Sequence, residues 1–103
     1  LSHNRMIIGH QDVDRIIHEP ARLLIMTILS TALTADFLYL LNESGLSKGN
    51  LSAHLSKLEN AGYVRIEKTY RGKVPNTLCQ LTEEGRKSFK DYRKQMKKIL
   101  KRH

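Results

Sequence analysis

Small polar side chains gather in residues 47–61, where a narrow apolar stripe predicts a helix. Leu51, Leu55 and Leu58 recur at helical spacing and form that stripe. The other face carries short polar groups, which suit a groove about 12 Å wide, the width of the DNA major groove. Asn50 has an amide that can bind adenine through two hydrogen bonds. An ordinary solvent-exposed amphipathic helix has a similar composition, and for the helix taken alone this alternative stays open.

The candidate contacts of this helix share small size or positive charge. Hydroxyl and amide groups can reach phosphates or base edges, ammonium groups suit phosphates, and an alanine can touch a thymine methyl. The residues with these groups are Ser47, Lys48, Asn50, Ser52, Ala53 and Lys57. We interpret them as a candidate DNA-binding surface.

A basic turn follows the helix. Residues 71–76 read RGKVPN, a composition typical of a turn, and they separate two stretches with the alternation of strands. Arg71 and Lys73 suit the phosphate backbone or a neighbouring minor groove. Because a hairpin beside a groove-binding helix can reach DNA, this pair favours DNA binding over a merely exposed helix.

Catalytic and metal-binding patterns are missing from the sequence. It contains no nucleophile elbow, phosphate-binding glycine loop or zinc-binding helix motif, so we expect neither an enzyme nor a cofactor. Cys79 is the only cysteine and is interpreted as a small buried residue. No metal is expected, because the histidines lack tight ligand spacing, although a site shared across a dimer stays open. The histidines are His3, His10, His18, His54 and His103. We interpret His54 as structural or as a phosphate contact.

Three helices must position these groups. Pro20 suits the first turn of a helix that continues to about residue 29. Thr34 is a good cap for a second helix, with Asp36 in its first turn. Gly45 can adopt the left-handed conformation that ends this helix, and Ser47 caps the next one. A short turn between two helices is typical of a helix-turn-helix.

Two strands and a last helix complete the pattern. Residues 63–70 and 77–81 are predicted to pair as a β-hairpin with a basic tip. Thr82 caps the last helix, whose acids and bases lie at the ends that the helix dipole favours. Its apolar residues step by three or four, which is typical of a helix that packs against another helix. They are Phe89, Tyr92, Met96 and Ile99.

The order of elements predicts one mainly α domain with a small β-hairpin, an α+β fold. A length of 103 residues fits a single domain. Residues 1–13 are interpreted as an N-terminal arm, which is either frayed or part of a first helix. Residues 14–81 are the predicted core, and residues 82–103 are the predicted C-terminal dimerisation helix.

Four segments resemble the small MarR/ArsR-like winged helix-turn-helix transcriptional regulators. Residues 19–29 resemble their first core helix, and residues 46–64 resemble their recognition helix and its entry to the wing. Residues 68–77 resemble their wing, and residues 81–86 resemble the start of their final helix. The resemblance covers about residues 14–100 and implies a stand-alone winged helix-turn-helix domain with a long C-terminal helix.

The resemblance also implies a function. We expect a transcriptional regulator, in particular a repressor, that binds double-stranded DNA as a homodimer. The recognition helix, about residues 47–61, would lie in the major groove, and the wing, about residues 70–77, on the backbone or in the minor groove. Two-fold symmetry implies half-sites about one helical turn apart. The implied DNA contacts are Ser47, Lys48, Asn50, Ser52, Ala53, Lys57, Arg71 and Lys73.

The terminal helices of this family imply a dimer interface, and the apolar stripe of the last helix agrees with that role. The interface residues would be Phe89, Tyr92, Met96 and Ile99. The open alternative is that the stripe packs against the chain's own first helix. A small-molecule effector is not specified by any residue set.

The net charge of +8 suggests a polyanionic partner, but it is unevenly distributed. Residues 34–62 hold two lysines against three acids, and residues 63–81 hold four basic groups against one acid. Residues 82–103 hold nine basic and three acidic groups, a net charge of +6. The recognition helix would therefore read bases through small polar groups, while the wing attracts phosphates.

The alternative function is that of a winged-helix protein–protein adaptor without DNA binding. Such an adaptor would not need Arg71 and Lys73 at the tip of the wing. No apolar run approaches the roughly 18 residues of a membrane span, and the N-terminus does not resemble a signal peptide. We therefore expect no membrane contact and a cytoplasmic location.

Overall fold

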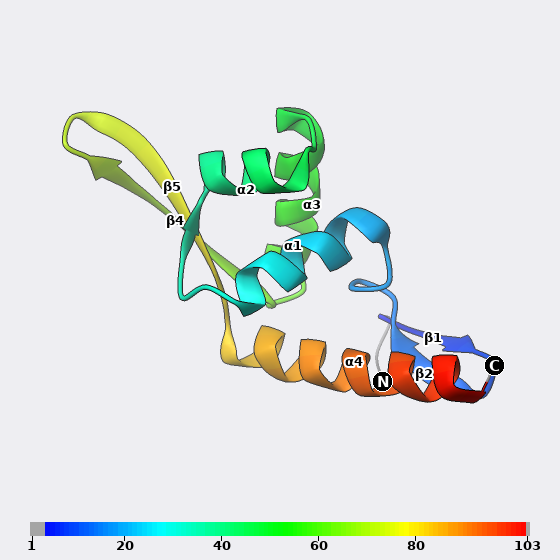
Figure 1. Ribbon diagram of the computed structural model, residues 1–103. Coiled ribbons are helices and arrows are strands. Elements are labelled where there is room, and N and C mark those ends of the chain that lie inside the picture. Colours follow the sequence, from blue (N-terminus) through cyan, green and yellow to red (C-terminus); the bar gives the residue numbers. More distant parts are fainter. Residues whose placement is uncertain (1–3, 103) are drawn as a thin grey trace.

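The computed structural model describes residues 4–102, which form four helices and two small antiparallel sheets (Figure 1). The helices are α1 (Pro20–Ser30), α2 (Phe37–Ser44), α3 (Lys48–Asn60) and α4 (Glu83–Arg102). Helix α1 lies in the middle, with α2 and α3 on one side of it and α4 on the other. The fold is α+β with a long C-terminal helix, so the predicted class is confirmed. No helix within this range has the length and apolar character of a membrane span.

The N-terminal segment forms a β-hairpin, which differs from the expected frayed arm or helix. Strands β1 (Arg5–Ile8) and β2 (Gln11–Asp14) pair in antiparallel register. Gly9, with φ of 60°, supplies the left-handed turn between them. Arg5 adds a side-chain link between the strands, since its Nε lies 3.3 Å from an Asp12 carboxylate oxygen. Residues 1–3 of the expected arm lie outside the described residues.

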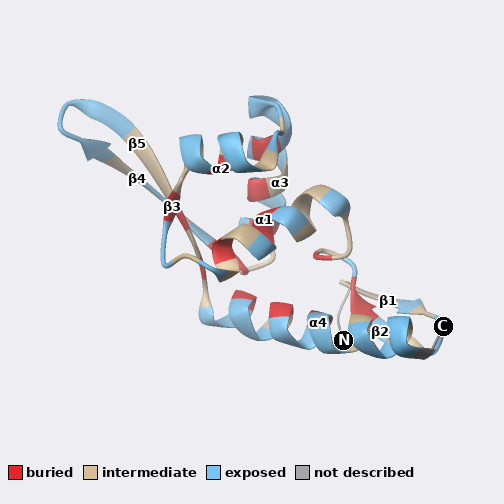
Figure 2. Ribbon diagram, in the orientation of Figure 1, coloured by how far each residue is buried: buried red, intermediate tan, exposed pale blue. Residues whose placement is uncertain are grey.

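Helix α1 begins as the sequence predicts. Pro20 occupies its first turn, and the Glu19 carboxylate caps it by accepting a hydrogen bond of 2.7 Å from the Arg22 backbone N–H. Ile25 and Leu29 on its inner side are fully buried. This helix therefore anchors the core between the other helices, as the burial colours show (Figure 2).

Helix α2 begins later than predicted. Ala35 and Asp36 form the short strand β3 (Ala35–Asp36), which pairs with Cys79 and Leu78. This pairing keeps the chain extended past Thr34, so Asp36 becomes the cap and accepts a 2.8 Å hydrogen bond from the Tyr39 N–H. The prediction that Thr34 caps α2 is therefore wrong. The short strand could not be anticipated because its partner lies more than 40 residues away.

The helix-turn-helix junction matches its prediction. Gly45 ends α2 with φ of 69°, and Ser47 caps α3 by accepting a 3.1 Å hydrogen bond from the Asn50 N–H. At the far end of α3, Gly62 has φ of 83° and turns the chain into the sheet. The sequence was sufficient to predict this junction, because the glycine that ends α2 and the serine that caps α3 each act on residues within four positions.

Strands β4 (Val64–Arg71) and β5 (Val74–Leu81) form a hairpin that projects from the body. The sheet order is β3–β5–β4. The turn contains only Gly72 and Lys73, which is shorter than the predicted turn of residues 71–76. Pro75 lies in β5 opposite Tyr70, beyond the reach of β3, and a proline is tolerated where a strand has a free edge.

Helix α4 packs against its own chain. Thr82 caps it by accepting a 2.9 Å hydrogen bond from the Gly85 N–H, as predicted. Phe89 and Tyr92 are only 6% and 4% exposed, and Met96 and Ile99 pack partly buried against the same core. Helix α4 contacts β2 and β5. Phe89 and Tyr92 are therefore covered by their own chain, with strands as the main partners in place of the expected first helix. The role of the stripe in a dimer stays a prediction.

Candidate nucleic-acid interface

Helix α3 presents a polar face to solvent. Leu51, Leu55 and Leu58 are buried against α1 and the sheet, which confirms the predicted stripe. All other residues from Ser47 to Asn60 are exposed, except His54, which is half-buried. The six predicted helix contacts are thus accessible together: Ser47, Lys48, Asn50, Ser52, Ala53 and Lys57. Their contact with DNA stays a prediction.

These six residues are spread over the exposed face of α3, from one flank to the other. Ser52 faces the wing and lines the cleft between α3 and the sheet. Lys57 lies on the opposite flank, where it lines a shallow hollow with Ile16 and Asn60. Ala53 lies between the flanks at the crest of the exposed face, because successive helical residues are rotated by about 100°. Ala53 thus gives the crest a small side chain, with the Ser52 hydroxyl on the wing side and the Lys57 ammonium group on the other.

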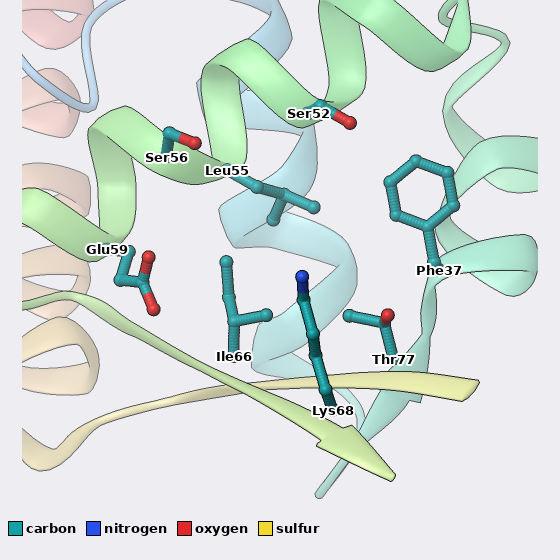
Figure 3. Close-up of a pocket in the computed structure, with 8 residues that line it drawn as sticks. All are labelled: Phe37, Ser52, Leu55, Ser56, Glu59, Ile66, Lys68 and Thr77. Carbon is teal, nitrogen blue, oxygen red and sulfur yellow. The ribbon is translucent and has the colours of Figure 1, made fainter. Parts of the chain in front are cut away.

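An open cleft of about 520 Å³ separates α3 from the wing (Figure 3). Its floor is apolar and its walls are polar. Leu55 and Ile66 form the floor together with Phe37, and hydroxyl groups come from the helix and β5. The lining residues are Phe37, Ser52, Leu55, Ser56, Glu59, Ile66, Lys68 and Thr77.

Lys68 is a cation of the wing that the sequence analysis missed. It points into the cleft from β4, towards α3 (Figure 3). The orientation of Lys68 could have been predicted from the sequence. Alternate residues of a strand share one face, and Val64 and Ile66 face the core. Lys68 is the next residue in that series, so strand alternation places its ammonium group on the side of the recognition helix.

The predicted wing residues do not share this side. Arg71 lies on the opposite face of the hairpin, where it lines a hollow with Asp36, Tyr39 and Asn76. Lys73 is exposed in the two-residue turn. The wing therefore carries positive charge on both faces and at its tip, with Lys68 nearest α3.

His54 is held at the flank of α3 by helix α1. Arg22 Nη1 lies 3.2 Å from His54 Nδ1, and Glu19 Oε1 lies 3.9 Å from the same nitrogen. A guanidinium group can only donate, so Nδ1 accepts and the ring proton is placed on Nε2. His54 thus has a structural partner, which is one of the two roles expected for it, and a contact with phosphate stays a prediction.

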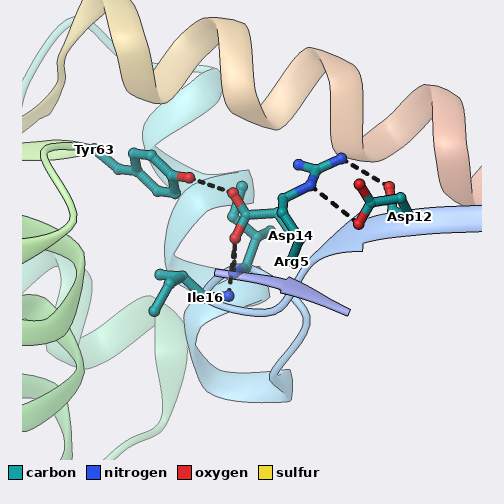
Figure 4. Close-up of polar contacts among 6 residues, drawn as sticks. Arg5, Asp12, Asp14, Ile16 and Tyr63 are labelled. Atoms are coloured by element: carbon teal, nitrogen blue, oxygen red, sulfur yellow. Dashed lines mark hydrogen bonds and ion pairs between the residues drawn. The ribbon is translucent and has the colours of Figure 1, made fainter. Parts of the chain in front are cut away.

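The end of α3 is fastened to α4 and β2 through Tyr63, a residue that the sequence analysis did not single out (Figure 4). The buried Tyr63 hydroxyl donates to Asp14, whose other carboxylate oxygen accepts from the Ile16 N–H at 2.8 Å. The Tyr63 carbonyl accepts from the Thr82 N–H at 3.0 Å. Burial, and then the hydrogen bond to Asp14, raise the pKa of Tyr63 to about 12.

Residues 4–102 include no group of three metal-ligating side chains. Cys79 is buried in β5, and burial raises the pKa of its thiol to about 11, so the thiol is protonated at neutral pH. Two of the histidines considered as ligands, His3 and His103, lie outside the described residues.

Comparisons with known proteins agree with this geometry. The family model for a winged helix DNA-binding domain matches residues 21–100. An uncharacterized protein of Methanocaldococcus jannaschii is 35% identical over 79 residues, which cover 76% of this chain and 85% of that protein. The structure of a transcriptional regulator homologue from Pyrococcus horikoshii is similar with a TM-score of 0.79 and 29% identity, over 84% of this chain and 85% of that one.

A more distant similarity concerns the fold alone. An ArsR family transcriptional regulator matches with a TM-score of 0.60 and 17% identity, over 86% of this chain and 87% of that one. The winged helix DNA-binding domain that the four sequence segments indicated is confirmed by the family model, in agreement with the similarity to a transcriptional regulator homologue.

Proposed function

The chain belongs to the winged helix DNA-binding domain family, and from this premise we propose that it is a sequence-specific regulator that binds duplex DNA as a homodimer. The family and the similarity to transcriptional regulators support a DNA-binding regulator rather than an enzyme. The observation that carries the proposal is the exposed polar face of α3 beside a cleft with Lys68 on its other wall.

In this proposal α3 enters the major groove with its small residues foremost. Gly49 and Ala53 allow close approach, since a Cβ added at Gly49 would have open space around it. Asn50 reads an adenine, and the serine hydroxyls reach phosphates or base edges. Residues 34–62 have two lysines against three acids, so this element contributes specificity more than electrostatic attraction.

The wing supplies the attraction to phosphate. Lys68 faces the cleft, Lys73 lies at the tip, and Arg71 lies on the far face of the hairpin. One duplex backbone that passes along the cleft meets Lys68 first, and Lys73 contacts the adjoining phosphates. We therefore add Lys68 to the contacts and assign Arg71 to the outer edge of the interface.

A homodimer places two recognition helices on one operator, and it needs an apolar surface. Phe89 and Tyr92 are already covered by their own chain. Ile7 in β1 and Leu100 in the last turn of α4 are 69% and 72% exposed. Helix α4 packs on the hairpin that contains Ile7, and Met96 and Ile99 are partly buried on the same helix. We place the dimer interface at this end of the molecule.

We propose repression as the mode of regulation. Occupation of an operator is sufficient to block transcription, whereas activation needs an additional surface for the transcription machinery. In this proposal the winged-helix core of residues 14–81 occupies the operator, and residues 82–103 contribute part of the dimer surface.

Selection of bound sequences from random duplexes tests the function. We expect enrichment of two inverted half-sites about one helical turn, roughly 10 base pairs, apart. Asn50→Ala is expected to relax one position in each half-site and to weaken operator binding by about 1–3 kcal/mol. Asn42→Ala on the exposed side of α2 is the matched control. Recovery of unenriched sequences from a folded protein would refute sequence-specific recognition.

A further inference from the structure

Helix α4 carries an exposed stripe of lysines that the proposed operator contacts do not use. At about 100° per residue, these lysines fall within an arc of about 100° opposite the buried apolar stripe. All of them are exposed. The lysine stripe consists of Lys87, Lys90, Lys94, Lys97, Lys98 and Lys101.

The charge of the lysine stripe is not neutralised within the described part of the chain. Among residues 4–102 the carboxylate of Asp12 pairs with Arg5 and that of Glu19 lies near His54, and neither contact involves α4. Asp91 is the one acid of α4 beyond its first turn. The stripe therefore presents a nearly uniform positive field to any partner.

The lysine stripe faces away from the proposed operator surface. Beyond its first turn, α4 lies on the other side of α1 from α2 and α3 (Figure 1). The inner side of α4 packs on β2 and β5, so the lysines on its other side point outwards from the body. A duplex seated on α3 and the wing leaves this stripe free.

We propose that the lysine stripe binds the phosphate backbone of a second DNA duplex without sequence preference, so that the protein bridges two duplex segments. Lys87 and Lys101 are 14 residues apart, which corresponds to about 21 Å along the helix. One DNA strand presents a phosphate about every 3.4 Å along the axis, so a row of this length meets roughly six phosphates. Six ammonium groups match that number, and flexible lysine stems follow the backbone without reading bases.

Two other polyanions fit the stripe less well. A helix that lies on an anionic membrane needs a free apolar face, but the apolar face of α4 is packed against the core. Single-stranded nucleic acid needs exposed aromatic side chains for base stacking, and both aromatic residues of α4, Phe89 and Tyr92, are buried. Lysines of two copies repel each other, so a second copy of the stripe is not its partner.

A sandwich capture experiment with the full chain tests the bridge. A biotinylated duplex on a surface is loaded with protein, washed, and then exposed to a fluorescent duplex of unrelated sequence. The test variant carries Lys90→Gln, Lys94→Gln, Lys97→Gln and Lys101→Gln, and the matched control carries arginine at the same four positions. We expect at least a tenfold loss of captured fluorescence for the glutamine variant and retention for the arginine control.

A second measurement separates this inference from the proposed function. With an operator sequence as the first duplex, the variant Lys68→Gln with Lys73→Gln is expected to weaken its loading through α3 and the wing, whereas the α4 glutamine variant keeps that loading. For the second duplex, the slope of log K against log salt is expected to fall by roughly 3–4 for the α4 variant, since four phosphate contacts are removed.

Three outcomes would overturn the proposal. Equal capture by the α4 glutamine variant would show that the recognition helices of a dimer bridge the duplexes by themselves. Lysine-dependent binding to phosphatidylglycerol vesicles, without lysine-dependent duplex capture, would assign the stripe to a membrane surface. Preferential competition by single-stranded DNA would assign it to that ligand. If the fourfold glutamine variant does not fold, the double variant Lys94→Gln with Lys101→Gln replaces it in the capture experiment. This double variant is expected to lose part of the captured fluorescence.

Discussion

At the scale of single residues, orientation matters as much as residue type. Lys68 and Arg71 are both basic and both exposed, yet they lie on opposite faces of one hairpin. The alternation of strand residues accounts for the difference, because even and odd positions face opposite sides. The positive charge of the wing alone therefore does not show which basic side chains can reach DNA. Each of them has to be tested separately.

Lys68→Gln is expected to weaken binding to all duplexes and to lower the salt slope by about one, because one phosphate contact is lost. Arg65→Gln is the matched control, since Arg65 lies in the same strand on the far face, where it lines a hollow with Thr34 and Leu78. Titrations at several salt concentrations measure both slopes. Identical slopes for the two variants would remove Lys68 from the interface.

Tyr63 and Asp14 form the buried polar contact on which a stability prediction rests. Tyr63→Phe leaves a buried carboxylate with one hydrogen bond fewer, and such a loss costs about 1–3 kcal/mol of the free energy of unfolding. Chemical denaturation at neutral pH measures this cost. A variant as stable as the parent would show that the contact contributes nothing net.

The same residue predicts a pH dependence. The folded-state pKa of Tyr63, about 12, is above its ordinary value of 10.0, so its contribution is complete below pH 10 and is lost as the pH rises towards 12. The difference in unfolding free energy between the parent and Tyr63→Phe is therefore expected to shrink over this interval. A difference that stays constant across the interval would contradict the proposed linkage.

At the scale of elements, the chain is held together where α3, β4 and α4 meet. The Gly62 carbonyl accepts from the Thr82 hydroxyl at 2.6 Å, and the Tyr63 carbonyl accepts from the Thr82 N–H. Gly85 lets the first turn of α4 approach that second carbonyl closely. The end of the recognition helix and the base of the wing are thus fixed by the start of α4.

Gly85→Ala is expected to destabilise the fold by more than 1 kcal/mol. A Cβ at this position would lie 2.1 Å from the Tyr63 carbonyl oxygen, so two backbone segments would have to separate. Gly49→Ala is the control, because its Cβ would have open space and alanine suits a helix. Thermal unfolding compares the two variants, and equal midpoints would refute the close approach.

At the scale of the whole molecule, its two sides and one end have different chemistry. The face of α3 is polar with small side chains, the outer side of α4 is basic, and the end of the molecule beside them exposes the apolar side chains of Ile7 and Leu100. This division assigns operator binding, backbone binding and dimerisation to separate surfaces. Each surface can therefore be tested with its own variants.

Ile7→Lys combined with Leu100→Lys is expected to shift a dimer to a monomer, because buried charges without partners are costly at an interface. Leu33→Lys is the control, since Leu33 is 85% exposed in the segment between α1 and α2. Light scattering at micromolar concentration measures the mass. A parent that is already monomeric would refute the dimer itself, and an unchanged dimer would place its interface elsewhere.

The sequence by itself determined the elements whose signals are local. Pro20, Gly45 and Ser47 act within a single turn, so the starts and ends of α1, α2 and α3 were largely predictable, with Thr34 as the exception. The apolar spacing of α3 likewise showed which of its sides is free, because burial of a helix follows its periodicity.

Only the tertiary structure decided what depends on distant partners. Strand β3 and the cap at Asp36 follow from pairing with β5, and the Tyr63–Asp14 contact joins residues 49 positions apart. The stripe of Phe89 and Tyr92 has the spacing of a helix that packs against any partner, and the fold supplied that partner from the same chain. Periodicity states that a face must be buried, whereas long-range packing chooses what covers it.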